Sequence, residues 1–367
     1  MPIGSYTRLR VTGQPPEHMR RAPSDLDRTY MNERRGTVER WLWGQAVSRV
    51  LSIKVSLNQP GLSVTLPLAS SSHRSTRRDG EMWLTDVNPQ RAISPYFRVH
   101  PQATATVETT LNASSSVEGN LTFAVLGTLI RATELASPGG ELVTSLNEGG
   151  YREAANFLDQ SLARLLGENI TERSTSDLPL TRTGAGGELT IISGIFPMGR
   201  PREVSRGEPR SIGEWRLTLD PPIVSIFSDT PWSAAAGATA IAPCATLAAG
   251  PDRQACVAFQ RVTAAGVLGL RVGDQTDLRQ AVTGDTGIQN AITRVAEAPE
   301  ASRAVLALTL CEAVAARAEG LGLNRYDAAA TVWALAEGGG LTGTVRAALN
   351  ASSCQPMVLA RTVGLAA

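Results

Sequence analysis

The sequence has almost no lysine: Lys54 is the only one, although lysine and arginine together number 35 among 367 residues. The 34 acidic side chains nearly balance them, and the formal net charge is +1. Such a chain has no overall field to attract nucleic acid, an anionic membrane or an acidic substrate, so any basic contact must be local. The arginine bias is typical of a GC-rich bacterial genome or a phage of such a host. The alternative is selection of arginine for two-pronged contacts with carboxylates or phosphates.

Long apolar runs are also missing. No stretch approaches the roughly 18 residues that a membrane helix needs, so we expect no transmembrane helix. The first residues, MPIGSYTRLRVTGQPPEHMRR, lack the apolar segment of a secretory signal peptide. We therefore expect a soluble chain or a mature form whose signal was removed, and we favour a virion, the cell envelope or the periplasm as its location.

Common catalytic motifs are absent as well. The sequence has no Gly-x-Ser-x-Gly nucleophile turn and no Gly-Lys-Ser/Thr phosphate loop. Its three histidines, His18, His73 and His100, do not have the spacing of a zinc pair on a helix. These observations favour a protein that is not an enzyme and that uses no cofactor or metal. Two carboxylates from distant parts of the chain, as in glycoside hydrolases, leave an enzymatic alternative open.

Cysteine is confined to the last third of the chain, at Cys244, Cys256, Cys311 and Cys354. Four cysteines allow three pairings. Cys244 and Cys256 flank a Gly-Pro-Asp turn, which suits a disulfide-closed loop. Cys311 lies in an apolar helical segment, where a free thiol behaves as a small hydrophobe. Disulfides and buried free thiols both stay open, whereas a metal site is disfavoured because no Cys-x-x-Cys pair or nearby His completes a zinc set.

The pattern of apolar residues changes along the chain. Residues 1–38 are polar and rich in Pro and Arg, without a periodic apolar face, so we expect an extended arm. Residues 39–231 are rich in period-2 alternation, which predicts strands. One hairpin is predicted from 51–57 and 62–68, which flank an Asn-Gln-Pro-Gly turn. The segment SSSHRSTRRDGE that follows this hairpin is polar and predicts a loop.

Helical spacing appears twice. A single helix is expected at about 150–167, with a face that includes Ala154 and Phe157 packed on the sheet. Residues 232–243 are interpreted as a linker, and residues 244–367 are Ala-rich with apolar residues near a period of 3.6.

Helix ends are marked inside this last part. Asn324 followed by Asp327 resembles a capping box, and Gly320 and Gly338 stand where helices should stop. The fold class predicted is therefore α+β: an N-terminal antiparallel β-sandwich-like domain with one packed helix, followed by an all-α C-terminal domain.

The stretch from Ala103 to Phe123 bears most directly on function. Its first arm has one small, mostly apolar face, and its return from Leu121 is more continuously apolar, as in a strand buried on both faces. We interpret it as a sandwich hairpin whose first strand lies near a sheet edge, where a neighbouring subunit or the N-terminal arm could pair with it. The contact residues of this strand would be Ala103, Ala105, Val107, Thr109 and Leu111.

Two arginine-rich segments are candidate contact loops. Nucleic-acid sites combine basic clusters with interleaved aromatic residues, so solvated loops or salt bridges to a neighbouring subunit are favoured over nucleic acid. The residues are Arg74, Arg77 and Arg78 in one loop and Arg202 and Arg206 in the other.

Together these features suggest a non-enzymatic structural protein that self-associates, as a component of a phage or viral particle or a subunit of a bacterial envelope complex. The expected partners are further copies or a larger protein assembly. One alternative is an oligomeric pore or secretion channel, in which residues 103–123 form barrel strands with one polar face. A carbohydrate-active hydrolase is the second alternative.

Overall fold

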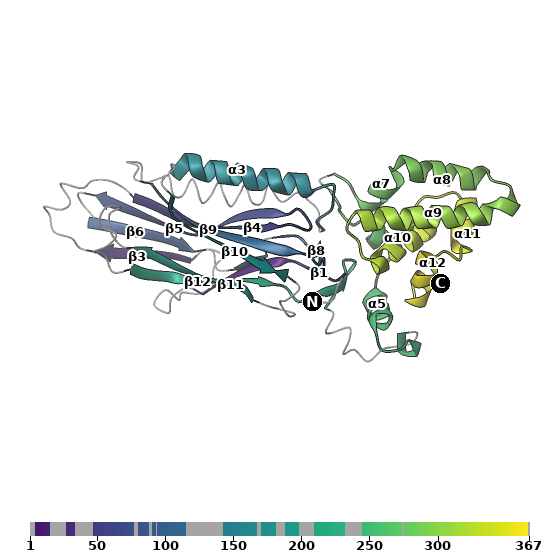
Figure 1. Cartoon of the computed structure of the whole chain (residues 1–367), viewed down its shortest axis with the longest axis horizontal. Coiled ribbons are helices and arrows are strands. Elements are labelled where there is room, and N and C mark those ends of the chain that lie inside the picture. Colours follow the sequence, from purple (N-terminus) through teal and green to yellow (C-terminus); the bar gives the residue numbers. More distant parts are fainter. Residues whose placement is uncertain are drawn as a thin grey trace.

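The molecule is elongated, with strands at one end and helices at the other (Figure 1). It was examined as a computed structural model. The structure describes residues 4–14, 27–33, 47–76, 80–87, 90–92, 94–114, 142–166, 170–180, 188–197, 209–231, 244–273 and 275–365. Antiparallel sheets form the N-terminal part, called the β region below (residues 4–231), and packed helices form the helical region (residues 244–365). The predicted α+β class is confirmed.

The strands are β1 (Tyr6–Thr7), β2 (Leu9–Gln14), β3 (Asp27–Glu33), β4 (Val47–Leu57), β5 (Ser63–Thr76), β6 (Gly80–Val87), β7 (Gln90–Ala92), β8 (Phe97–Arg98), β9 (Thr104–Ser114), β10 (Ile170–Pro179), β11 (Glu188–Pro197), β12 (Pro209–Leu219), β13 (Ile223–Ser225) and β14 (Ser228–Pro231). The helices are α3 (Glu148–Leu166), the 3-10 turn η3 (Cys244–Thr246), α5 (Pro251–Phe259), α6 (Ala264–Leu268), α7 (Leu278–Thr283), α8 (Thr286–Glu297), α9 (Glu300–Gly320), α10 (Arg325–Gly338), α11 (Gly343–Asn350) and α12 (Gln355–Thr362).

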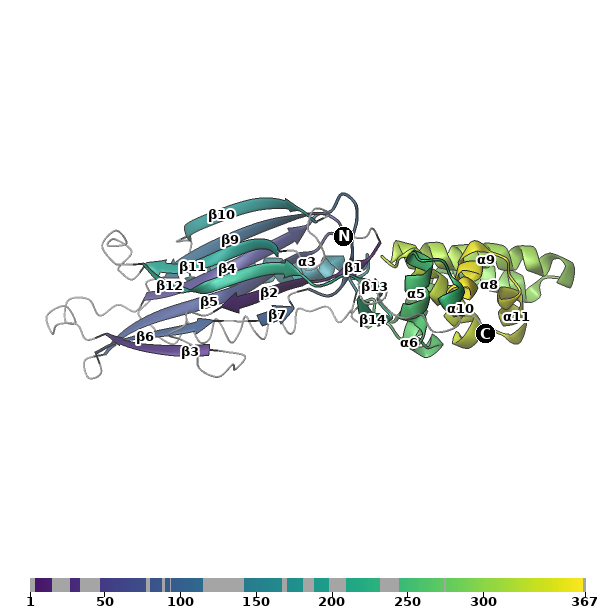
Figure 2. The ribbon, with the colours of Figure 1, turned by 90° about the horizontal axis from the view of Figure 1, so that it is seen from below.

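The strands form three antiparallel sheets. A six-stranded sheet has the order β10-β9-β4-β5-β6-β3, and a four-stranded sheet has the order β11-β12-β2-β7. These two stack on one another, and α3 covers the outer face of the first (Figures 1 and 2). A small third sheet, β14-β13-β1-β8, lies where the strands meet the helices.

The predicted hairpin is confirmed as β4 and β5. Ile53 and Val55 of β4 are fully buried and pack with Trp215 and Leu217 of β12 in one core cluster between the stacked sheets. Alternation explains this arrangement, because every second residue of a strand points to the same face. Lys54, on the opposite face, lies across from Thr65.

The polar segment after this hairpin differs from expectation. β5 continues to Thr76 and pairs with β6 from Gly80 onward. Most of the expected loop is therefore strand, because β5 has a partner on each side, β4 and β6, that extends its hydrogen-bonded ladder.

Part of the segment expected to be an arm forms strands of the body. Tyr6 in β1 and Leu9 in β2 are fully buried. Arg8 and Arg10 each bond Asp220, with Nε–Oδ distances of 2.6 Å. Burial alone would raise the pKa of Asp220, but hydrogen bonds from Arg10 and Arg8 outweigh it and lower that pKa. The partners lie more than 200 residues away, so the local pattern does not reveal them.

Helix α3 is present where the sequence predicts it. Among its described side chains, Tyr151 and Ala155 are buried, and Asp159 accepts hydrogen bonds from Lys54 and, at 2.9 Å, from the Thr65 hydroxyl. Phe157, expected to face the sheet, is 58% exposed. Tyr151, Ala155 and Asp159 follow one another at a spacing of four residues, which places them on one helix face and leaves Phe157 outside it.

The helical region is built around α10. This helix is buried on nearly all sides by α6, α9, α11 and α12, as expected for a helix that is apolar all round. Helix α9 ends at Gly320 and α10 at Gly338, as predicted. Asn324 caps α10 by accepting from the Tyr326 and Asp327 amides, at 3.0 and 2.9 Å.

Candidate functional site: the junction of the two regions

The N-terminus of α10 meets the β region at a buried polar cluster, here called the junction. Besides capping α10, Asn324 donates through Nδ2 to the carbonyls of Gly4 at 3.0 Å and Val224 at 2.9 Å. Its backbone N–H donates to the Tyr6 hydroxyl at 2.6 Å. Asn324 thus ties the start of α10 to β13 and Gly4 through its side chain and to β1 through its backbone.

Asp327 lies one turn further along α10 and is fully buried. Its carboxylate accepts from the Ser225 hydroxyl at 2.5 Å and from the Ile226 backbone N–H at 3.0 Å, and it is also hydrogen-bonded to the Tyr6 hydroxyl. The expected capping box is therefore only half present: Asn324 caps the helix, whereas Asp327 bonds across the junction.

The electrostatics of the junction follow from burial. Burial raises the pKa of Asp327 to about 6, against the hydrogen bonds from Ser225, Tyr6 and Ile226 and the charge of Arg98, which lower it. Burial and the neighbouring Asp327 charge raise the pKa of Tyr6 well above its usual value. A general base must reach its substrate, and neither side chain has any exposed surface. The arrangement therefore holds the two regions together and leaves neither side chain open to a substrate.

Further contacts join the two regions beside this cluster. Arg98 of β8 donates to the Leu323 carbonyl at 2.9 Å, and the Thr144 hydroxyl donates to the Val272 carbonyl at 2.6 Å. Apolar packing is continuous too, because Tyr6, Leu142 and several residues of 223–226 belong to the same core cluster as the helices.

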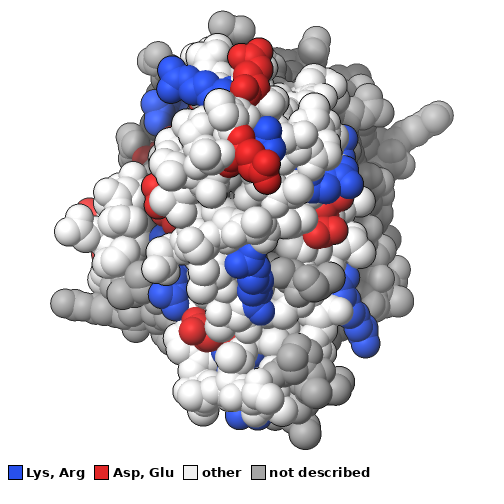
Figure 3. Space-filling view, turned by 90° about the vertical axis from the view of Figure 1, so that its right-hand side faces the viewer, with Lys and Arg blue, Asp and Glu red and all other residues white. Residues whose placement is uncertain are grey.

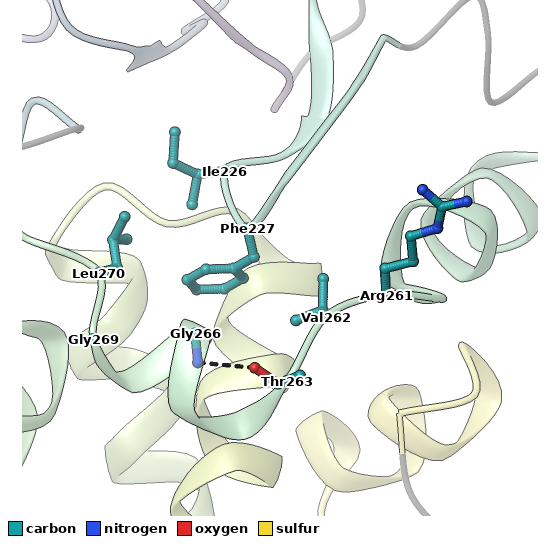
Figure 4. A pocket seen from close by; sticks show the side chains of 8 residues that line it. All are labelled: Ile226, Phe227, Arg261, Val262, Thr263, Gly266, Gly269 and Leu270. Carbon is teal, nitrogen blue, oxygen red and sulfur yellow. Dashed lines mark hydrogen bonds between the residues drawn. The ribbon is translucent and has the colours of Figure 1, made fainter.

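A cavity of 240 Å³ opens beside the junction, where the β13–β14 turn meets α6. It is lined by Ile226, Phe227, Arg261, Val262, Thr263, Gly266, Gly269 and Leu270. Figure 4 shows the Phe227 ring among the apolar residues, with Arg261 pointing away from it, and the Thr263 hydroxyl accepting from the Gly266 N–H at 3.1 Å. The lining holds no carboxylate, so this cavity lacks the acid pair of a glycosidase.

The four cysteines form two disulfides. Cys244 pairs with Cys256, as the turn between them suggested, and Cys311 pairs with Cys354. The Cα–Cα separations are 5.6 and 6.4 Å. The second bond joins α9 to the start of α12, so the free-thiol alternative does not describe this structure.

The strand expected at a sheet edge is an inner strand. β9 pairs with β4 on one side and with β10 on the other. Ala103, Ala105 and Val107 are buried in the sandwich core, and Thr109 is partly buried. The expected position of this strand near a sheet edge is therefore wrong, because β10, which follows α3 in the chain, pairs along that side. The return arm from Leu121 lies outside the described residues.

Of the candidate basic residues, only Arg74 is described. It lies in β5 opposite Met82 of β6, not in a loop. Arg77, Arg78, Arg202 and Arg206 lie outside the described residues. At the helical end of the molecule, Arg and acidic side chains are interspersed (Figure 3).

The described residues include no group of three or more His, Cys, Asp or Glu side chains placed to hold a metal ion. Within the same part of the chain, no helix has both the length and the apolar character needed to cross a bilayer. Comparison with protein-family models, curated proteins and solved structures finds no significant match.

Asp327 is the residue that sequence reasoning missed. Its position three residues after Asn324 is explained by a capping box, and this explanation hid its bonds across the junction. The available signal was the helix itself: α10 is apolar all round and must be buried, so its acid must have partners elsewhere in the fold.

Proposed function

We propose that the chain is a non-enzymatic structural subunit that acts by self-association in a larger particle or envelope complex. The observation that carries the proposal is the junction, which joins a β-sandwich and a helix bundle into one elongated body. Domains linked by ordinary interfaces move relative to one another. A shared apolar core with Asn324 and Asp327 bonded across it opposes such motion.

Rigidity of this kind suits a subunit whose task is to hold position. The junction has no exposed reactive group: Tyr6 and Asp327 are fully buried and satisfy each other. A long rigid body instead offers separate contact surfaces at the sandwich and at the helices. Its function is then to set the distance between its neighbours.

The two disulfides support an oxidising location. Disulfides persist in extracellular, periplasmic and particle-surface environments and are rare in reducing compartments. Cys244–Cys256 and Cys311–Cys354 both staple the helical region. We therefore infer assembly at the cell envelope or in a particle outside the reducing cytoplasm.

The test is the native mass of the purified protein, with and without reductant, measured by mass photometry and light scattering over a range of concentrations. We expect multiples of the 38.8 kDa chain mass that grow with concentration, and we expect reductant to weaken assembly through the helical region. A strict monomer over the whole range, with or without reductant, would overturn the proposal.

A further inference from the structure

Strand β10 is an edge with one open side. Among the described strands it pairs only with β9, at the end of the six-stranded sheet (Figure 2). It has ten residues, whereas strands average about 5 to 6. A long edge strand presents unpaired backbone groups that can pair with another chain.

The backbone groups on this open side can be identified. On β9, the N–H of Thr104 donates to Asn58 Oδ1 at 2.7 Å and its carbonyl accepts from the Asn58 N–H at 3.2 Å, so both groups point toward β4. The carbonyl of the preceding residue, Ala103, accepts instead from the Leu180 N–H on the β10 side, at 3.0 Å. In an antiparallel ladder this direction alternates from residue to residue.

The same alternation applies along β9. Thr106, Glu108 and Thr110 must also direct their backbone groups toward β4, and they lie opposite residues 177, 175 and 173 of β10. The register shift in this pairing lies between Ile170 and Glu172, outside this stretch. The N–H and carbonyl groups of Arg173, Thr175 and Asp177 therefore face away from the sheet.

The described side chains in the middle of this edge, at residues 175–177, are small and polar. Thr175, Ser176 and Asp177 are exposed, and Asp177 accepts from the Thr106 hydroxyl at 2.5 Å. No proline occurs before Pro179, whose missing N–H ends the open ladder. Nothing bulky in this exposed stretch keeps another strand away.

We propose that β10 pairs antiparallel with β10 of a second copy of this chain, about a two-fold axis at Thr175. This inference rests on the proposed function, because it names the surface through which the subunit associates. The pairing places position 173 of each copy opposite position 177 of the other, so an arginine and an aspartate face each other twice. Opposite charges at facing positions stabilise a sheet, and like charges destabilise it.

Neighbouring registers are less favourable. A centre at Ser176 places Arg173 opposite Pro179, which has no N–H to donate. A centre at Ser174 places Asp177 opposite Thr171, without charge pairing. A single strand pair is a small interface, so the association is concentration-dependent and reversible.

Cysteine cross-linking tests the register. All four native cysteines are in disulfides, so T175C introduces a single free thiol. In the proposed pair the two residues at position 175 have Cα atoms about 5.5 Å apart, within the range that a disulfide spans. Under mild oxidation we expect T175C to form a covalent dimer at least tenfold faster than N156C, whose thiol lies at an exposed position on α3.

A proline and a charge swap test the pairing itself. T175P removes an N–H of the open edge but no bond to β9, so we expect loss of the dimer at an unchanged melting temperature. D177R sets like charges opposite each other and should weaken dimerisation about tenfold, and R173D/D177R should restore it.

The failures of the two proposals are distinguishable by native mass. If the wild type assembles but T175P assembles equally and T175C cross-links no faster than N156C, the β10 interface is wrong and the structural role stands. If the wild type stays monomeric at every concentration, both are wrong.

Discussion

The β region and the helical region bury their cores with different side chains. Between the stacked sheets the buried residues are large, with Trp215, Ile53 and Leu217 among them. In the helical region the central helix α10 contributes mainly alanines, at 328, 329, 330, 334 and 336. Stabilisation by burial scales with apolar area, and alanine offers little of it. Small side chains let helices approach closely, but they leave the bundle more dependent on other stabilisation.

Both disulfides lie in the region with the smaller side chains. Residues 4–231 contain no cysteine, and large side chains stabilise the core of the sandwich directly. Covalent bonds in the helical region restrict its unfolded chain instead. The two regions are thus stabilised in different ways, and the following experiments test this difference and the junction between the regions.

Removal of the Cys311–Cys354 bond should have the largest effect. The bond closes a loop of sequence separation 43, which predicts a loss of about 4 kcal/mol in the free energy of unfolding for C311A/C354A. The bond of separation 12 predicts about 3 kcal/mol for C244A/C256A. Urea denaturation measures both losses. Hydrogen exchange should increase in α9 and α12 before it increases in β4 and β5, and equal increases in both regions would contradict the distinction drawn above.

D327A should have the next largest effect, because it acts on both regions at once. It leaves the donors Ser225, Ile226 and Tyr6 without their shared acceptor. Buried unsatisfied donors cost about 1 to 3 kcal/mol each, and removal of a buried charge offsets part of this, so we expect a net loss of about 3 kcal/mol. E337A, at an exposed position of the same helix, is the control and should change stability by less than about 0.5 kcal/mol.

The pH dependence of stability isolates the Asp327 charge. Its pKa in the folded protein is about 6, above the usual 3.8, so the folded state binds the proton more tightly than the unfolded state. The contribution of Asp327 to the free energy of unfolding is therefore greatest below pH 3.8, and it falls by about 3 kcal/mol as the pH rises through 6.

The comparison with D327N separates this effect from that of Asp220. The lowered pKa of Asp220 has the opposite effect on stability, because the stabilisation that Asp220 provides is lost as the solution becomes acidic. The difference in free energy of unfolding between wild type and D327N cancels Asp220. That difference should change between pH 4 and 7, and a flat difference would show that Asp327 does not titrate there.

K54M should have the smallest effect. The only lysine bonds Asp159 of α3, and the two side chains are 28% and 35% exposed. Partly exposed ion pairs contribute little, so we expect a loss of about 0.5 kcal/mol by thermal denaturation. K54R keeps the charge and should retain most of this contribution. A loss as large as that of D327A would mean that α3 depends on a single ion pair.

Local patterns of the sequence predict the local parts of this fold. The β4–β5 hairpin, the position of α3 and the cap at Asn324 follow from residue spacing within one element. Contacts between distant residues leave no such pattern. The sequence alone predicts an arm at β1 and β2 because their partner strands, β7, β8, β12 and β13, all come much later in the chain. It predicts an edge at β9 because β10 follows only after α3.

The candidate site was less predictable than the fold. Asp327 and Tyr6 are unremarkable in their own segments, and their roles arise only when α10 meets β1 and β13. The Cys244–Cys256 pair could be inferred from its turn, whereas the partner of Cys311 depends on how α9 and α12 pack. The spacing of residues along the chain predicts contacts within one helix or strand, but it carries little information about which helices and strands contact each other.

The bond between Tyr6 and Asn324 also constrains the order in which the chain can fold during synthesis. Its two residues are 318 positions apart. At translation rates of about 5 to 20 residues per second, the first strand waits roughly 15 to 60 s for its partner to be made. Throughout that time Tyr6 lacks the acceptor that Asp327 provides, and Ser225 lacks it from its own synthesis onward. The nascent sandwich therefore leaves the ribosome with an incomplete end, and the last third of the chain closes it.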